Sequence, residues 1–279
     1  MKDMKLGIQM WSIYDVCMRE GFPKVFELLH DMGYQGMEFC LNSDATLRAK
    51  FDGNIDLREV IHAARDNDIK LIGTHLSMER LLEDPAPILD ECLELGLPCA
   101  AIGPAFYADR TPIRDQQEMY GHVVRFAQMF KQAGIQLQVH CSAFGYLRDY
   151  RGRRVVDAMF EEAGLENLQP EFDTAWMICG GVIPTEYLKK YRDYVDYLHF
   201  KDFHPPLEDS DYILVRHNAV ADHYMERGTA VGLDGIQDLG AIISTARECS
   251  TKWLIVELWN EPDSLENAEI SINNLKAHM

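Results

Sequence analysis

The sequence lacks any uninterrupted apolar run of the roughly 20 residues that a membrane-spanning helix needs. The first residues, MKDMKLGIQMWS, also lack the apolar core and small-residue cleavage site of a secretory signal. We therefore expect a cytoplasmic protein with no membrane partner.

Positive charge is scarce as well. The chain has 27 Lys and Arg against 45 Asp and Glu, which gives a formal net charge of −18. Such an acidic surface repels phosphate backbones, so a nucleic-acid partner is not expected. The seven cysteines are scattered and form no C-x-x-C pair. This spacing argues against a disulfide framework or a zinc knuckle and favours buried, reduced thiols.

What the sequence does contain is a repeated alternation of short β-rich segments with longer segments that have apolar residues at helical spacing. Between the first seven β-rich segments the spacing is roughly thirty residues, which is typical of a βα unit. The predicted strands are Leu6–Met10, Gly36–Phe39, Lys70–Thr74, Cys99–Ile102, Gln136–His140, Pro170–Asp173, Val195–Phe200 and Trp253–Leu258.

Eight βα units predict an α/β fold, a (β/α)8 TIM barrel formed by a single domain over residues 1–279. A doubly wound parallel sheet is the alternative, but no G-x-G-x-x-G follows a predicted strand. One interval breaks the period. Residues 202–233 carry little periodicity and are expected to form a long loop over the catalytic face.

Four potential metal ligands fall at the ends of four successive predicted strands: His140, Asp173, His199 and Glu257. In a barrel these ends lie around part of one mouth, so the side chains can converge on a single ion. Two imidazoles and two carboxylates suit Mn, Co, Zn or Fe(II) better than Ca or Mg. Each residue also has a structural interpretation, as a hydrogen-bonded core histidine or a carboxylate that caps a turn. The coincidence at four consecutive strand ends favours the metal site.

Further side chains are expected at the same mouth. Trp11, Trp176 and Trp259 can pack on sugar C–H faces or can close the barrel top as core residues. Lys201 has the parity of His199 and should also point inward, where it could donate to a substrate oxygen or pair with Glu171 or Asp173.

Three more residues near predicted strand ends could contact a substrate. Glu38 and His75 could bind a hydroxyl or act as acid or base, although a structural role is also open for both. His204, followed by two prolines, starts a rigid loop that can reach the site.

These residues resemble the sugar phosphate isomerase/epimerase superfamily, which has a xylose isomerase-like TIM barrel and includes inosose dehydratase-type and keto-sugar epimerase-type enzymes. The resemblance covers nearly the full length. It rests on KLGIQMWSI, GYQGMEF, FDTAWM, YLHFKD and VELWNEPDSLENAEIS. It implies that His140, Asp173, His199 and Glu257 bind one divalent cation. Manganese is the first choice, with zinc, cobalt, iron and magnesium as alternatives.

The sequence departs from the family pattern at three points. His140 stands where a glutamate is usual, Trp176 replaces the histidine of a D-x-x-H, and Ala230-Val231-Gly232 replaces a G-x-G. In the epimerases two metal-bound glutamates transfer protons from opposite faces of the substrate. Here only Glu257 remains of the two.

The resulting prediction is a metal-dependent isomerase or epimerase that acts on a keto-sugar or keto-cyclitol through an enediolate. Glu257 would be the base, with His140 and Lys201 as further catalytic residues. A dehydratase or eliminating lyase is the alternative, because elimination needs only one base and one acid. An endonuclease-IV-type phosphodiesterase and a non-catalytic sugar binder are more remote. The expected partner is a small sugar. A homo-oligomer is compatible with the sequence, since barrels of this kind often associate.

Overall fold

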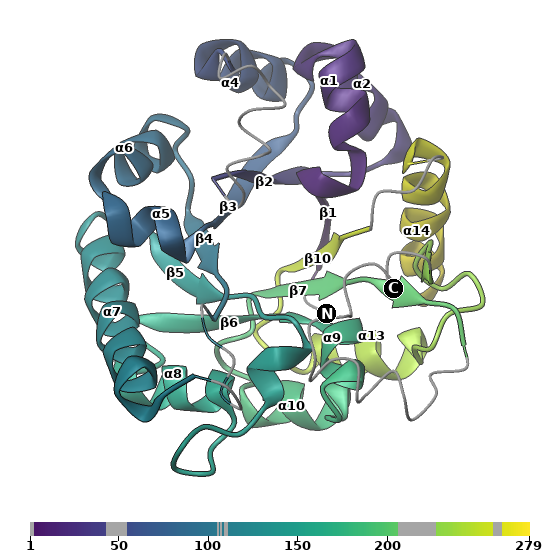
Figure 1. Ribbon diagram of the computed structural model, residues 1–279. Helices are drawn as coiled ribbons and strands as arrows, with labels where there is room; N and C mark the ends of the chain where they lie inside the picture. The colour runs from purple at the N-terminus through teal and green to yellow at the C-terminus, as the bar shows by residue number, and fades with distance from the viewer. Residues whose placement is uncertain are drawn as a thin grey trace.

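The computed structural model describes residues 3–42, 55–104, 106, 108, 111–205, 227–258 and 264–279. Within these ranges, parallel strands form a closed barrel in the order β1-β10-β7-β6-β5-β4-β3-β2 (Figure 1). The strands are β1 Lys5–Gln9, β2 Gly36–Asn42, β3 Lys70–Leu76, β4 Cys99–Ile102, β5 Gln136–Val139, β6 Leu168–Asp173, β7 Tyr197–Phe200 and β10 Trp253–Val256. The predicted (β/α)8 barrel is confirmed, and the doubly wound alternative is wrong.

The barrel closes because β1 and β10 pair in parallel, with Lys5 opposite Trp253 and Ile8 opposite Val256. This pairing joins segments from near the two ends of the chain. Every strand therefore has two hydrogen-bonded neighbours, and all eight strands direct their carboxyl ends toward the same mouth.

Helices surround the barrel in the order that the alternating pattern predicts (Figure 1). They are α1 Tyr14–Glu20, α2 Phe22–Met32, α4 Leu57–Asp66, α5 Met78–Glu83, α6 Ala86–Glu94, α7 Ile113–Gln132, α8 Val155–Ala163, α9 Thr174–Cys179, α10 Pro184–Lys190, α13 Leu239–Arg247 and α14 Ser264–His278. Two short 3-10 helices, η1 Met10–Ile13 and η2 Ala143–Tyr146, follow strands at the mouth.

Helix α2 illustrates how the sequence forms these elements. Its apolar residues Val25, Phe26 and Leu29 recur at helical spacing and are fully buried against the barrel. The helix ends at Gly33, whose φ of 92° lies in the left-handed region that glycine adopts without a Cβ clash. A glycine directly after the last apolar residue thus marks the end of this helix in the sequence.

Residues 202–233, predicted as a long loop, begin and end in ordered structure. Strand β8 (Asp202–Phe203) pairs antiparallel with β9 (Gly228–Thr229). The buried Asp202 carboxylate accepts the backbone N–H groups of Phe203, Gly232 and Ile236. Residues 206–226 lie outside the described ranges, so the predicted position of the loop over the catalytic face stays a prediction.

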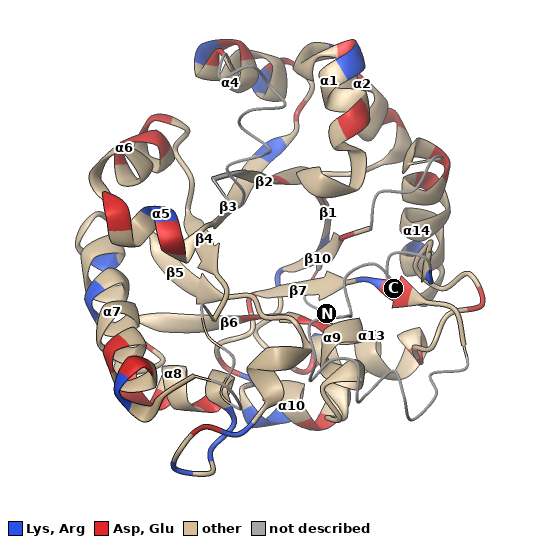
Figure 2. Cartoon of the chain, viewed as in Figure 1, with Lys and Arg blue, Asp and Glu red and all other residues tan. Residues whose placement is uncertain are grey.

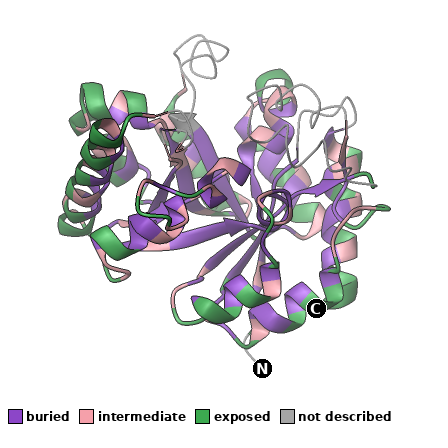
Figure 3. Cartoon of the chain, turned by 60° about the horizontal axis from the view of Figure 1, so that its bottom comes forward, coloured by how far each residue is buried: buried purple, intermediate pink, exposed green. Residues whose placement is uncertain are grey.

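Burial and charge are distributed as a barrel requires. The strands are buried, and the outer surfaces of the helices are exposed (Figure 3). Acidic and basic residues lie mainly on the outer helices and loops (Figure 2). All seven cysteines are buried. Among the described residues, no helix is both long and apolar enough to span a bilayer.

Candidate metal centre

Three neighbouring strands carry polar residues at two consecutive inward positions near their carboxyl ends. Because side chains alternate along a strand, residues two apart face the same side, about 6–7 Å apart along the strand. These pairs are Gln138 and His140 on and after β5, Glu171 and Asp173 on β6, and His199 and Lys201 on and after β7. The result is an outer and an inner level of polar side chains inside the barrel.

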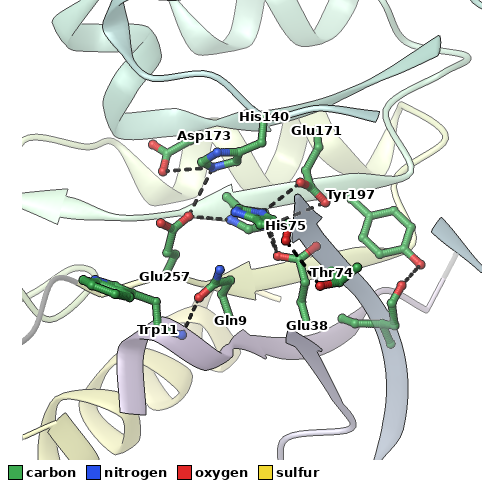
Figure 4. A network of polar contacts seen from close by, with 12 residues as sticks. Gln9, Trp11, Glu38, Thr74, His75, His140, Glu171, Asp173, Tyr197 and Glu257 are labelled. Atoms are coloured by element: carbon green, nitrogen blue, oxygen red, sulfur yellow. Dashed lines mark hydrogen bonds and ion pairs between the residues drawn. The ribbon is translucent and has the colours of Figure 1, made fainter. Parts of the chain in front are cut away.

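At the outer level, His140, Asp173 and Glu257 form what we call the mouth cluster. His140 Nε2 lies 3.1 Å from Glu257 Oε2 and 3.8 Å from Asp173 Oδ2. One ligand atom from each of the three residues lies within 4.8 Å of the others. Figure 4 shows these side chains directed toward one another from separate strands. The mouth cluster therefore unites three of the four predicted metal ligands.

His199, the fourth predicted ligand, reaches this cluster through one ring nitrogen. Its Nδ1 lies 2.8 Å from Glu257 Oε2 with hydrogen-bond geometry, while its Nε2 faces the opposite direction. The side chain is fully buried. His199 therefore lies between the mouth and the deeper barrel interior.

Lys201 points inward, as its parity predicts. Its Nζ donates a hydrogen bond to Glu257 Oε1 at 2.8 Å, lies 3.6 Å from Asp173 Oδ2 and sits 5.2 Å from the centre of the Trp176 ring. The expected pairing with Asp173 is present, whereas the described contacts give no pairing with Glu171. Lys201 brings an ammonium group next to two carboxylates at the mouth.

Asp173 has the capping role that the sequence left open, and it keeps one carboxylate oxygen unpaired. Its Oδ1 accepts the backbone N–H of Trp176 at 2.8 Å and so caps helix α9. Its Oδ2 is buried, faces His140 and Lys201, and has no hydrogen-bond partner. One oxygen therefore fixes the carboxylate and leaves the other for a ligand.

Below the mouth lies a second group, which we call the inner cluster: Glu38 of β2, His75 of β3, Glu171 of β6 and His199 of β7. His75 Nε2 lies 3.0 Å from Glu38 Oε2 and 3.2 Å from Glu171 Oε2. His199 Nε2 lies 3.0 Å from Glu38 Oε2 and 3.6 Å from Glu171 Oε1. Glu38 and His75, predicted as substrate-binding residues, thus contact one another in the interior. His75 belongs to β3 and does not follow it as predicted.

The charges in these clusters shift one another's proton affinity. Burial lowers the pKa of His75, but the nearby Glu38 and Glu171 carboxylates outweigh it and raise the pKa to about 10. Burial and the same two carboxylates act on His199, and the pKa is raised well above its usual value. The pKa of Glu171 is held well below its usual range despite burial, because the His199 and His75 rings favour the carboxylate. Lys201 and His140 lower the pKa of Glu257 in the same way.

The mouth cluster fits a divalent cation. His140 Nε2 and Asp173 Oδ2 are buried and have no hydrogen-bond partner in the protein, although both lie beside other potential ligands. Buried polar atoms of native proteins are nearly always paired, so such orphans indicate a missing ligand. Imidazole and carboxylate donors are typical of Mn, Zn, Co and Fe(II) sites.

A cavity of about 630 Å³ opens beside these groups. His75 and His140 form its inner wall, and residues after β3 and β4, including Met78 and Gly103, form much of the rest. The volume is in the range of small-molecule sites. A ligand in this cavity can therefore reach both clusters.

Of the remaining predicted substrate-binding residues, the structure describes Trp11, Trp176 and His204. Trp11 is half-buried, stacks on Tyr14 at 5.3 Å, and donates its backbone N–H to the Gln9 side chain (Figure 4). Trp176 is buried against Phe203. The His204 side chain is exposed. Trp259 lies outside the described residues.

Glu171 is a site residue that the sequence predicts only as an alternative partner of Lys201. It is fully buried and contacts both histidines of the inner cluster. The signal was present in the segment PEFD, because Glu171 shares the inward parity of Asp173. A buried carboxylate in an apolar strand requires a partner.

A closed parallel barrel with imidazole and carboxylate side chains at the carboxyl ends of its strands defines a TIM barrel with a candidate metal centre. The chain belongs to the xylose isomerase-like TIM barrel family, whose profile matches residues 26–278. The resemblance inferred from the sequence is therefore confirmed at the level of the superfamily. No curated protein matches the sequence.

Several solved structures share the fold. A sugar phosphate isomerase/epimerase from Parabacteroides distasonis has a TM-score of 0.75 at 18% identity, covering 98% of this chain and 94% of that one. A probable 3-DHS dehydratase from Bacillus anthracis has a TM-score of 0.70 at 14% identity, covering 97% and 99%. The IOLI protein, solved with a zinc atom, has a TM-score of 0.69 at 15% identity, covering 99% and 96%. At identities of 14–18%, these matches show that the chain has the same fold as these proteins.

Proposed function

We propose that this protein is a divalent-metal-dependent sugar isomerase or epimerase that acts on a keto-sugar or keto-cyclitol through an enediolate. The observation that carries the proposal is the convergence of His140 Nε2, Asp173 Oδ2 and Glu257 Oε2 from three strands beside a cavity of about 630 Å³. His199 would complete the ligand set through Nδ1, as the sequence predicts. The isomerase/epimerase and the zinc-containing structure with the same fold support this choice.

A divalent ion bound at the mouth would polarise a substrate carbonyl and acidify the neighbouring C–H bond. Glu257 is the base in this proposal. Its lowered pKa keeps it ionised at neutral pH, and His140, His199 and Lys201 surround it. Lys201 can move its ammonium group from Glu257 to a substrate oxygen and stabilise the negative charge that develops there.

A dehydratase or eliminating lyase is the second candidate. His140 occupies the position where a second glutamate base would stand, and the other nearby glutamates, Glu38 and Glu171, lie within 3.0–3.6 Å of histidines in the interior. With Glu257 as the one glutamate at the mouth among the described residues, elimination by one base and one acid becomes a direct competitor of epimerisation. The dehydratase with the same fold supports this alternative.

Incubation with a panel of keto-sugars and inososes in deuterium oxide plus Mn tests both candidates. Epimerisation or isomerisation would place solvent deuterium at the carbon next to the carbonyl, and elimination would release water or another leaving group. Mass spectrometry and NMR measure both outcomes. If a broad panel gives neither deuterium incorporation nor elimination, the proposal is wrong, and a non-catalytic sugar binder becomes the better hypothesis.

Replacement of Lys201 by methionine should lower kcat by about 10²–10³-fold while the metal remains bound, because the variant loses the donor to the developing oxyanion. The matched control is Lys252→Met. Lys252 precedes β10 at the opposite end of the barrel, where its exposed side chain pairs with Asp196. Steady-state kinetics and metal analysis of both variants provide the measurement. An unchanged kcat in Lys201→Met would remove Lys201 from the mechanism.

A further inference from the structure

The inner cluster has the composition and the dimensions of a metal site of its own. We propose that Glu38, His75, Glu171 and His199 bind a second divalent cation, below the ion of the mouth cluster and sharing His199 with it. This inference depends on the geometry of the interior. It goes beyond the proposed reaction and does not require it.

The potential ligand atoms of the inner cluster lie close to one another. The two histidine Nε2 atoms and the two carboxylates alternate around a ring, with separations of 3.0, 3.2, 3.0 and 3.6 Å. Ligands at the usual 2.0–2.2 Å from a tetrahedral zinc ion stand about 3.3–3.6 Å from one another. The observed separations lie within a few tenths of an ångström of this range, so small side-chain movements would let the four groups surround one ion.

The same atoms also lack hydrogen-bond partners. Both oxygens of Glu38, both oxygens of Glu171 and the Nε2 atoms of His75 and His199 are buried without a hydrogen-bond partner in the protein. Each nitrogen lies 3.0–3.6 Å from both carboxylates. Buried polar atoms that face one another without a hydrogen-bond partner are expected where nitrogen and oxygen ligands surround one ion.

The other side of the His199 ring supports the assignment. Its Nδ1 forms a hydrogen bond of 2.8 Å with Glu257 Oε2. Histidines that bind metal through one nitrogen usually donate the other N–H to a carboxylate, which fixes the tautomer and the ring. An inner ion held by Nε2 would leave the Nδ1 proton in place, whereas a mouth ion held by Nδ1 would have to displace that proton to solvent.

Charge balance also favours a second cation. Four carboxylates, Glu38, Glu171, Asp173 and Glu257, are buried within two layers, and Lys201 is the permanent cation that contacts them in the described structure. An isolated buried carboxylate is costly unless it is paired or bound to metal. A single divalent ion at the mouth leaves Glu38 and Glu171 paired with His75 and His199 alone.

The inner cluster is accessible from the cavity. The His75 side chain is 14% exposed and, together with His140, lines the cavity of about 630 Å³. His75 therefore connects the inner cluster to the cavity. Two imidazoles and two carboxylates again suit Zn, Mn, Co or Fe(II). The bound ion would hold the His199 ring in place beneath the mouth.

Metal content of the purified protein tests this inference. The chain is stripped with a chelator, loaded with Mn or with Zn, and analysed by mass spectrometry of the metal. Anomalous diffraction at the metal edge then locates each ion. We expect two ions per chain in the wild type and one in Glu171→Gln, which lacks an inner ligand. Asp173→Asn should also bind one ion, because it lacks a mouth ligand but keeps the Oδ1 atom that caps α9.

Two further variants make the result interpretable. Glu166→Gln, at an exposed position shortly before β6, should keep both ions. Glu38→Gln gives a second inner-site variant in case Glu171→Gln does not fold. A wild type that binds a single ion at the mouth, or none, would overturn the inference. An ion at the inner cluster with none at the mouth cluster would support the inner site. The same result would contradict the proposed reaction, which depends on an ion at the mouth.

Discussion

Glu257→Gln is expected to lower kcat by about 10²–10⁴-fold, the usual contribution of a general base. The substitution keeps the size of the side chain and removes its charge. Glu257 is contacted by His140 at 3.1 Å, by His199 at 2.8 Å and by Lys201 at 2.8 Å. The affinity for the mouth ion should also fall, by more than the roughly 10–100-fold that loss of an outer-shell partner costs.

Steady-state kinetics and metal titration on the same preparation separate the two effects. Saturating metal should restore occupancy in Glu257→Gln without restoring kcat, because the base is still absent. Glu266→Gln, at an exposed position of α14, is the matched control and should behave like the wild type. Full recovery of kcat at high metal concentration would show that Glu257 is only a ligand and that the base lies elsewhere.

His199→Ala is expected to lower the free energy of unfolding by about 3–5 kcal/mol in metal-free protein, as breaking a buried ion pair does. The ring is fully buried and contacts three glutamates: Glu38 at 3.0 Å, Glu171 at 3.6 Å and Glu257 at 2.8 Å. Its pKa is raised well above the usual value by Glu38 and Glu171, although burial opposes the shift. Loss of the ring would leave these carboxylates with less compensating charge and a cavity between β7 and β10.

Urea unfolding followed by circular dichroism measures this effect. His30→Ala is the control, since His30 lies on α2 with a side chain that is 58% exposed, and its loss should change stability by less than about 0.5 kcal/mol. A similarly small change for His199→Ala would mean that the buried contacts of this ring contribute little net stability.

Most of the fold could be predicted from the sequence because its signals are local. Alternation of β-rich and amphipathic segments depends on side-chain periodicity within a few residues, and glycine ends such as Gly33 depend on one backbone conformation. Strand ends differed from prediction by a few residues. His75, for example, was expected after β3 and lies within it. Residues 206–226 and Trp259 lie outside the described structure, so the predictions made for them stay predictions.

The candidate site was predicted in part. His140, Asp173 and Glu257 could be selected because each stands at the carboxyl end of a strand, where a barrel brings side chains together. The inward direction of Lys201 followed from its parity with His199. The sequence criterion for a metal ligand is the last inward residue of each strand. Glu171 does not meet it, because Glu171 lies two residues before Asp173, one inward position deeper in the barrel.

The sequence by itself determined the alternation of strands and helices, the acidic exterior, and the presence of metal-ligand residue types at strand ends. Only the tertiary structure decided which of these residues meet. Glu38 and His75 come from β2 and β3, whereas Glu171 and His199 come from β6 and β7, on another part of the closed barrel. Their contacts across the interior depend on barrel closure and on the depth of each residue along its strand. Neither is encoded in local periodicity, because both follow from the register that hydrogen bonding sets between strands far apart in the chain.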